Sequence, residues 1–376
     1  MALRFLTAGE SHGPALTAII EGLPAGLPLS AEDIDRDLAR RQQGYGRGGR
    51  MAIERDRVQI TGGVMAGQTI GAPVSLIVEN RDWANWQGRE APAWTVPRPG
   101  HADLAGAIKY GLADMRWVAE RASARETTMR VAVGAVCKQL LRMLRIEVGS
   151  YVAELGGVSA TVPDLPWPEL WSLAEASDVR CPDAAAAERM RAEIDAARQA
   201  GDSLGGVLLV AAIGVPVGLG SHVHWDRRLD ARLAQAIMSI PAIKGVEIGP
   251  AFANARLRGT EVHDALYPAA VGDAARAGGV IRRTNRAGGV EGGMSNGEPI
   301  VIRAAMKPIP TTLAPQPSVD RTTGQATETQ YQRSDVCALP AACIVAEAML
   351  AWVLADAVLE KFGGDSMAEL LQRVQP

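Results

Sequence analysis

The chain has 376 residues, of which 47% are hydrophobic and 22% are charged, and its formal net charge at pH 7 is -3. This composition is typical of a soluble globular protein, and the slight acidity argues against a nucleic-acid-binding protein, whose surface usually carries excess Lys and Arg. No linker, low-complexity segment or fixed-period repeat divides the sequence, so its length alone leaves open whether it forms one large domain or two or three smaller ones.

The apolar segments and the cysteines indicate in which cellular compartment the protein is expected. The N-terminal stretch MALRFLTAGESHG has an apolar patch too short for a signal peptide, so we expect a cytoplasmic protein. The longest apolar run, residues 338–362, contains Glu347 and Asp356, which predicts a buried helix rather than a membrane span. No C-x-x-C spacing indicates zinc or disulfides, so we expect four reduced thiols: Cys137, Cys181, Cys337 and Cys343.

Hydrophobic patterning predicts mixed elements. Strand-like stretches occur at 58–62, 73–79, 148–158, 206–213 and 299–304. Helical periodicity occurs at 31–42, 104–119, 124–145, 184–199, 227–239 and 340–361. Because strands and helices are intermixed without regular βαβ spacing, an α+β layered fold fits better than a doubly wound sheet.

The stretch GYGRGG at 44–49 matches the pattern G-x-G-x-x-G of dinucleotide-binding loops. In those loops the glycines follow a strand and open a helix. Here they follow a helix that Ser30 and Asp33 are expected to cap, so they lie at its negative end. A cofactor loop is therefore disfavoured, and a cluster of arginines surrounds the stretch: Arg40, Arg41, Arg47 and Arg50.

Two histidines lie on predicted turns. His12 lies in GESHG directly after a strand-like segment, and His101 lies in RPGHAD beside Arg98, where Asp103 can cap the following helix. Histidine titrates near neutral pH and suits proton delivery to a leaving group. The alternative for each is a histidine that only completes a turn.

An anion site is predicted at RASARETT, 121–128. Ser123 and Glu126 have the S-x-x-E spacing of a capping box that would open the helix 124–145, with Arg121 and Arg125 beside its free N–H groups. A phosphate could be held there, although an ordinary capped helix with solvated arginines explains the pattern equally well.

Three further stretches favour ligand contact or positioning. The run 285–300 contains Gly288, Gly289, Gly292 and Gly293, which allow close backbone approach, and KPIPTT at 307–312 predicts a rigid loop. Asp335 precedes the long apolar helix, where an acidic residue is most often a helix-start charge.

The stretch HVHWD places His222, His224 and Asp226 close together. A catalytic zinc usually takes three protein ligands with supporting groups, and nothing nearby in the sequence supplies that support. We therefore expect no metal.

Eight stretches together resemble the chorismate synthase family, in order and with family-like spacing: GESHG, RRQQGYGRGGRM, RPGHAD, ERASARETT, SIPAIKGVEIG, GGVEGGMSNGEP, KPIPTT and RSDVCALP. The resemblance runs from Thr7 to near Lys361. It implies a single-domain β-α-β sandwich over residues 1–376 that assembles as a homotetramer. The stretch 159–200 carries least of the resemblance, and we interpret it as a variable peripheral segment. It also implies the 1,4-elimination of phosphate from 5-enolpyruvylshikimate-3-phosphate to give chorismate, with reduced FMN required.

The resemblance also implies roles for single residues. His12 would lie beside the leaving phosphate, His101 near the flavin, and Asp335 would assist proton removal through flavin N5. Arg41 and Arg47 would hold the anionic substrate, or alternatively NADP. Flavin contacts would come from Arg121, Ala122, Ser123, Pro241, Ala242, Gly292, Lys307, Pro308, Ile309, Pro310, Thr311 and Arg333.

Two other classes of protein stay open from the sequence. A flavin-dependent reductase that uses NAD(P)H is superficially supported by GYGRGG. A non-catalytic polyanion-binding module would instead show a steep salt dependence.

Overall fold

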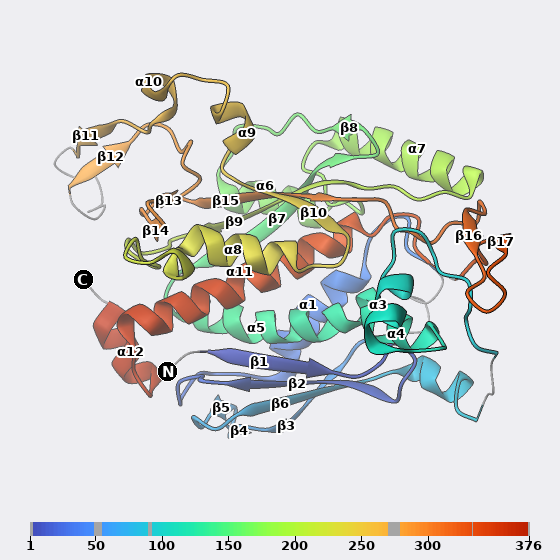
Figure 1. Ribbon diagram of the computed structural model, residues 1–376. Helices are drawn as coiled ribbons and strands as arrows, with labels where there is room; N and C mark the ends of the chain where they lie inside the picture. The colour runs from blue at the N-terminus through green and yellow to red at the C-terminus, as the bar shows by residue number, and fades with distance from the viewer. Residues whose placement is uncertain (1–2, 49–54, 89–91, 270–278, 333, 375–376) are drawn as a thin grey trace.

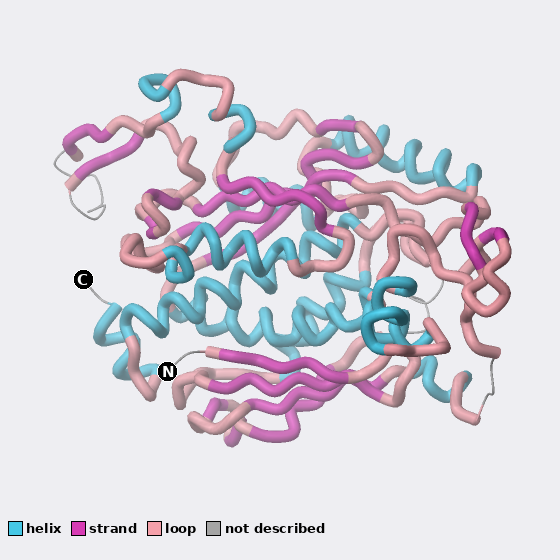
Figure 2. Tube along the Cα trace, viewed as in Figure 1, coloured by secondary structure: helices cyan, strands magenta, loops and turns pink. Residues whose placement is uncertain are grey.

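The computed structural model describes residues 3–48, 55–88, 92–269, 279–332 and 334–374, and consists of two antiparallel sheets with helices between them (Figure 1). The first sheet has the order β1 (Arg4–Ala8), β2 (Ala15–Glu21), β6 (Val74–Glu79), β3 (Val58–Gly62). The second has the order β10 (Ile243–Ile248), β15 (Ile300–Met306), β9 (Gly206–Ile213), β7 (Glu147–Leu155), β8 (Val158–Ser159). Figure 2 shows the helical layer that separates them.

The middle layer consists of α1 (Ala31–Gln42), α5 (Thr127–Met143), α8 (Leu229–Met238) and α11 (Leu339–Phe362). Helix α11 is long and apolar enough to cross a membrane, but almost all of it is buried against α5, α8 and the second sheet. The predicted buried helix is therefore observed, and the predicted α+β sandwich is confirmed. Helix α6 (Trp167–Glu175) lies on the outer face of the second sheet, and α7 (Ala184–Ala200) lies beside the edge strand β8 with its buried side chains in the main core. Both helices occupy the segment expected to be peripheral.

Shorter elements complete the described chain. The remaining helices are α3 (Asp103–Tyr110), α4 (Arg116–Ala122), α9 (Ala251–Asn254), α10 (Gly259–Val262) and α12 (Met367–Val374). Single 3-10 turns are η1 (Arg81–Asn85), η2 (Ala124–Glu126) and η3 (Trp225–Arg227). Small hairpins are β4 (Val64–Met65) with β5 (Gln68–Thr69), β11 (Leu266–Pro268) with β12 (Val280–Arg282), β13 (Val290–Glu291) with β14 (Met294–Ser295), and β16 (Pro317–Val319) with β17 (Ala326–Glu328).

Local sequence signals explain where several helices begin and end. The Ser30 hydroxyl accepts a hydrogen bond from the Asp33 N–H and the Asp33 carboxylate accepts one from the Ser30 N–H, so the predicted capping box of α1 is confirmed. The helix predicted over 104–119 is interrupted, because Gly111 takes a left-handed conformation and ends α3. The predicted helix 124–145 begins with η2 and is regular only from Thr127.

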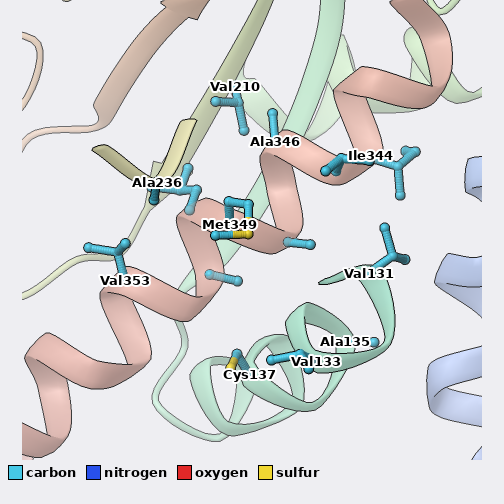
Figure 3. Close-up of a cluster of buried hydrophobic side chains, with 14 of the residues drawn as sticks. Val131, Val133, Ala135, Cys137, Val210, Ala236, Ile344, Ala346, Met349 and Val353 are labelled. Atoms are coloured by element: carbon cyan, nitrogen blue, oxygen red, sulfur yellow. The ribbon is translucent and has the colours of Figure 1, made fainter. Parts of the chain in front are cut away.

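The core is aliphatic and centres on the contact between α5 and α11. Figure 3 shows side chains of both helices, with Val210 of β9 and Ala236 of α8, meeting in this cluster. The two helices approach most closely where Gly134 faces Ala348: a Cβ at position 134 would lie 2.2 Å from the Cβ of Ala348. Only glycine fits there, because protein interiors leave no room for such an overlap.

A network of charged side chains lies inside this core. Glu347 of α11 is fully buried, and its carboxylate accepts hydrogen bonds from Lys138 at 2.6 Å and from Arg40 at 2.8 Å. Ser150 of β7 and Arg180 approach its other oxygen at 2.6 and 3.5 Å. Burial alone would raise the pKa of Glu347, but the three cations hold it well below its ordinary value.

We expect Glu347→Gln to lower the free energy of unfolding by about 3–5 kcal/mol at pH 7, because it leaves buried cations without their counter-charge. The matched control is Glu360→Gln on the same helix, where an exposed carboxylate binds Arg232 at 2.8 Å. That change should cost at most about 1 kcal/mol. Urea denaturation of the two variants measures the difference, and equal losses would contradict a stabilising role for the network.

Candidate active site

His12 follows β1 on a turn that α4 holds in place. Its backbone N–H and its Nδ1 each contact one oxygen of Glu120, at 2.6 and 2.7 Å. The Trp86 ring lies against the imidazole with the ring centres 4.4 Å apart. The neighbouring Ser11 hydroxyl is 3.2 Å from that of Ser123, which is a further contact between the turn and the end of α4.

His101 also contacts a carboxylate through Nδ1. The Asp103 carboxylate is 2.6 Å from this atom and also accepts two hydrogen bonds from the Arg98 guanidinium, at 2.8 and 3.0 Å. Burial would raise the pKa of Asp103, but the bonds from His101 and Arg98 hold it well below its ordinary value. Asp103 was predicted to cap α3, and this is wrong: the helix has no side-chain cap, and the carboxylate is engaged by Arg98 and His101 instead.

Two buried arginines share one buried carboxylate between α1 and the start of α5. Arg125 Nη1 lies 2.6 Å from Asp56, and Arg41 Nη1 lies 3.5 Å from the other oxygen of the same carboxylate. Arg41 also donates to the Thr127 hydroxyl and to the Ala124 carbonyl. Its Nη1 is buried and makes no hydrogen bond to a described residue.

The electrostatics of Arg41 indicate an excess of positive charge. Burial lowers the pKa of Arg41 to about 10, with Asp56 opposing this shift and Arg125 and Arg47 adding to it. A bound anion at this place would offset the cost of holding the guanidinium cation out of water.

The glycine-rich loop after α1 packs against the segment that leads into α11. Arg47 Nη1 lies 2.7 Å from one oxygen of Asp335, and the Gly48 N–H donates to the other at 2.7 Å. A Cβ at Gly46 would lie 3.3 Å from the Cβ of Cys337, so this glycine allows close packing of chain on chain. The helix before the loop is confirmed, which places these glycines away from a helix N-terminus.

The His12 turn, the His101–Asp103 contact, the two arginines on Asp56 and the Arg47–Asp335 pair form one connected set. This set lies at the end of the sandwich where α3 and α4 lie (Figure 1). Asn80 accepts a hydrogen bond from Arg125 and donates to the carbonyls of Glu10 and Gly13, on either side of His12. At the other end of the set, the Ser334 hydroxyl donates to the Thr311 carbonyl, and the Thr311 hydroxyl accepts from Arg98. The predicted residues His12, His101, Asp335, Arg41 and Arg47 are therefore brought together.

A hollow of about 560 Å³ opens beside this set, between β1 and the loop after α8. Its lining includes Arg121 and Ala122 of α4 and Pro241, three of the predicted flavin contacts, together with Leu6 and Thr7 of β1. The volume is in the range of pockets that bind cofactors. Arg121 donates to the Thr7 carbonyl and hydroxyl on the wall of the hollow.

The loop predicted from KPIPTT joins the hollow to the His101 turn. The Lys307 N–H donates to the carbonyl of Ala242, a residue with a positive φ of 69°. A Cβ at Gly100 would lie 3.6 Å from Pro310 and 3.8 Å from Lys307 Nζ. The intervening residues Pro308 and Ile309 continue this loop, and the Ser203 hydroxyl donates to the Ile309 carbonyl.

Comparison with known proteins identifies the family. The sequence profile of the chorismate synthase family matches residues 3–359. The chain belongs to the chorismate synthase family. It is 57% identical to the chorismate synthases of Pelobacter propionicus, over 99% of this chain and 98% of that protein, and of Geobacter sulfurreducens, over 98% and 96%. A solved structure titled "Crystal Structure of Chorismate Synthase" superposes with a TM-score of 0.81 at 45% identity, covering 99% of this chain and 96% of that one.

One predicted flavin contact, Gly292, is not part of this set. Gly292 lies at the tip of the hairpin β13–β14, beside the first turn of α8, where Gly293 contacts Arg228. Pro241 follows the last turn of the same helix, so the two are separated by its whole length (Figure 1). Arg333 lies outside the described residues, as does Arg50.

The anion site predicted at RASARETT has a different geometry. Ser123 accepts from the Arg125 N–H and so caps η2, as expected. Glu126, however, binds Arg130 at 2.8 Å rather than completing the capping box. The Arg125 side chain is buried on Asp56 instead of lying in solvent beside the helix start.

The HVHWD stretch forms a surface turn. His224 Nδ1 lies 2.6 Å from Asp226, and both side chains are more than half exposed. Among the described residues, no group of three His, Cys, Asp or Glu side chains is arranged to hold a metal ion. The four cysteines are buried free thiols.

Sequence analysis missed three residues of this chorismate synthase site: Glu120, Asp56 and Asn80. Glu120 lies inside the quoted stretch ERASARETT, but its contact with His12 spans 108 positions. Asp56 and Asn80 lie in stretches without a motif, and only their burial beside arginines reveals them. Burial is a property of the folded chain, so no local signal in the sequence could have indicated Asp56 or Asn80.

We expect Asp103→Asn to destabilise the protein at pH 7 by about 3 kcal/mol, because a buried carboxylate that binds Arg98 and His101 is lost. The folded pKa of Asp103 is depressed, so its stabilisation is complete above the unfolded pKa of about 3.9 and disappears as pH falls through the folded pKa. The difference in the free energy of unfolding between wild type and variant should therefore become smaller below about pH 4.

Asp226→Asn is the matched control for this change. Asp226 follows His224 by two positions and lies 2.6 Å from its Nδ1, as Asp103 does with His101. The His224–Asp226 pair is exposed, so removal of its charge should alter the free energy of unfolding little. Thermal melts of both variants from pH 3 to 8 measure the contrast. A difference that stays constant with pH would contradict the assigned ionisation of Asp103.

Proposed function

We propose that this chain is a chorismate synthase that eliminates phosphate from 5-enolpyruvylshikimate-3-phosphate in a 1,4 sense to yield chorismate, a carbon–oxygen lyase reaction. This is the last step of the shikimate pathway, which leads to aromatic amino acids. Family membership supports the proposal, and the observation in this chain that carries it is the positive charge of the buried Arg41 and Arg125 and the partly buried Arg47. A substrate with one phosphate and two carboxylates requires such a cluster in a protein of negative net charge.

The residues around the hollow fit reduced FMN as the cofactor. Arg121, Ala122 and Ser123 lie at the end of α4, and Pro241, Ala242 and the loop Lys307–Thr311 lie across from them. Burial and the nearby Lys244 lower the pKa of Lys307. An anionic ligand bound beside this ammonium group would offset both effects. When bound, reduced FMN supplies electron density to the breaking bond, with no net redox change over the cycle.

The chain's own residues have separate tasks in this proposal. Arg41 and Arg47 bind the anionic groups of the substrate and fix its orientation. His12 delivers a proton to the phosphate as it leaves with the electron pair of the carbon–oxygen bond. Asp335, fixed by Arg47 and the Gly48 N–H, assists removal of the proton lost from carbon, and His101 acts as a second proton donor on the flavin side.

The proposal extends to a homotetrameric, cytoplasmic enzyme. It also leaves two ligands to be distinguished at Arg41 and Arg47, because NADP and the substrate both carry phosphates. A flavin reductase that uses NAD(P)H would require these arginines for the nucleotide, whereas the present proposal requires them for the shikimate ester.

We expect the purified protein to release phosphate from 5-enolpyruvylshikimate-3-phosphate under anaerobic conditions only when dithionite-reduced FMN is present. Phosphate release is measured directly, with oxidised FMN and no flavin as controls. Equal turnover with oxidised FMN, or none with either form in a folded sample, would refute the proposed reaction.

We expect Arg47→Ala to lower kcat/KM roughly 10- to 150-fold, since a charge-assisted hydrogen bond contributes about 1.5–3 kcal/mol. Arg47→Lys should restore activity only in part, because an ammonium cannot reproduce the planar fork. Arg57→Ala, which removes an exposed arginine bound to Asp35, should leave kcat/KM unchanged. Titration of both ligands identifies the role: a loss of affinity confined to NADPH would favour the reductase.

A further inference from the structure

Glu120 binds the two N–H groups of a single histidine. Its two oxygens lie 2.6 Å from the His12 backbone N–H and 2.7 Å from His12 Nδ1. Its own carbonyl accepts a hydrogen bond from the Ser11 N–H at 3.1 Å. One residue of α4 therefore fixes the backbone and the imidazole of a turn that lies 108 positions earlier in the chain.

Hydrogen bonds with Asn80 and α4 hold the backbone of the turn, but they do not reach the imidazole ring. The turn is flanked by Gly9, which has a positive φ of 108°, and by Gly13. Glycine imposes few limits on backbone conformation, so the orientation of the ring depends on its contacts. The Trp86 ring against one face and the Glu120 carboxylate at Nδ1 are two of these contacts.

An ionised carboxylate only accepts hydrogen bonds, and an imidazole carries its proton on one nitrogen or on both. A carboxylate at Nδ1 therefore selects the form in which Nδ1 carries a proton, in the neutral as well as the charged ring. Proton exchange with a ligand must then use Nε2, on the opposite side of the ring. Both side chains are only partly exposed, at 26% for His12 and 16% for Glu120, so water competes weakly with this contact.

We propose that Glu120 is the positioning residue for His12: it holds the imidazole as the Nδ1–H tautomer and directs Nε2 toward the departing phosphate. This inference rests on the proposed function for the identity of the leaving group. The tautomer and the coupling of the two residues rest on the geometry alone.

The test is Glu120→Gln, which keeps the size of the side chain and replaces one acceptor with a donor. We expect kcat to fall at least about 10-fold, because a partner that fixes the tautomer and orientation of the histidine is lost, with KM changed little. Glu120→Asp, which keeps the charge but is shorter, should recover part of the loss. Glu169→Gln, an exposed acid on α6, is the control and should match wild type.

A double-mutant cycle separates positioning from general structural support. In a His12→Ala background Glu120→Gln should cost nothing further, because the group it orients is absent. Losses that multiply in the double variant, or an unchanged kcat in the single variant, would overturn the proposal.

The tautomer can be read without turnover. In protein labelled with ¹⁵N in its five histidine rings, the His12 signals, assigned by His12→Ala, should show a protonated Nδ1 in wild type and a shift of that population in Glu120→Gln. A wild-type ring protonated on Nε2 alone would refute the role of Glu120. If wild type released no phosphate, the proposed function would fail while this measurement would still decide the positioning.

Discussion

The buried carboxylate of Glu347 is the constraint on which the arrangement of the middle layer depends. It is fully removed from water, and cations from α1, α5 and the turn after α6 converge on it. A charge in such a place is tolerated only when every partner is in position, so the network specifies how α1, α5 and α11 sit relative to one another. The burial of the surrounding aliphatic side chains drives folding, and the ion pairs determine how the three helices are aligned.

Consecutive residues of α1 connect this network to the active site. Arg40 turns inward to Glu347, whereas Arg41 turns toward Asp56 and the start of α5. The chain then leaves the helix and Arg47 meets Asp335 just before α11. The site is therefore built where the ends of the core helices meet, and its positive charge is held by elements that the core already fixes. Such preorganisation spares the protein the cost of gathering like charges when a ligand binds.

Local features of the fold could be predicted because their causes lie within a few residues. The capping box of α1, the strand before His12 and the five predicted strands depend on short patterns of hydrogen bonding and hydrophobicity. The pairing of distant side chains could not be predicted. Arg47 and Asp335 are 288 positions apart, and neither stretch contains a pattern that indicates the other as its partner. Asp103 shows the same limit, since a cap and an arginine partner are equally consistent with its position, and tertiary contact decided between them. Motif order across the whole chain gave the family where no single motif could.

The closest approach of α5 and α11 links shape to charge. Gly134 faces Ala348, and the residue before Ala348 is Glu347. A methyl group added to α5 at this point would have to push α11 away, and the carboxylate would move with it, away from Lys138 on the same helix that pushed. A Cβ at position 134 would also lie 2.3 Å from the Cα of Ala348, so a smaller residue on α11 could not make room for it, and glycine on α5 keeps the Glu347–Lys138 ion pair aligned inside an apolar layer.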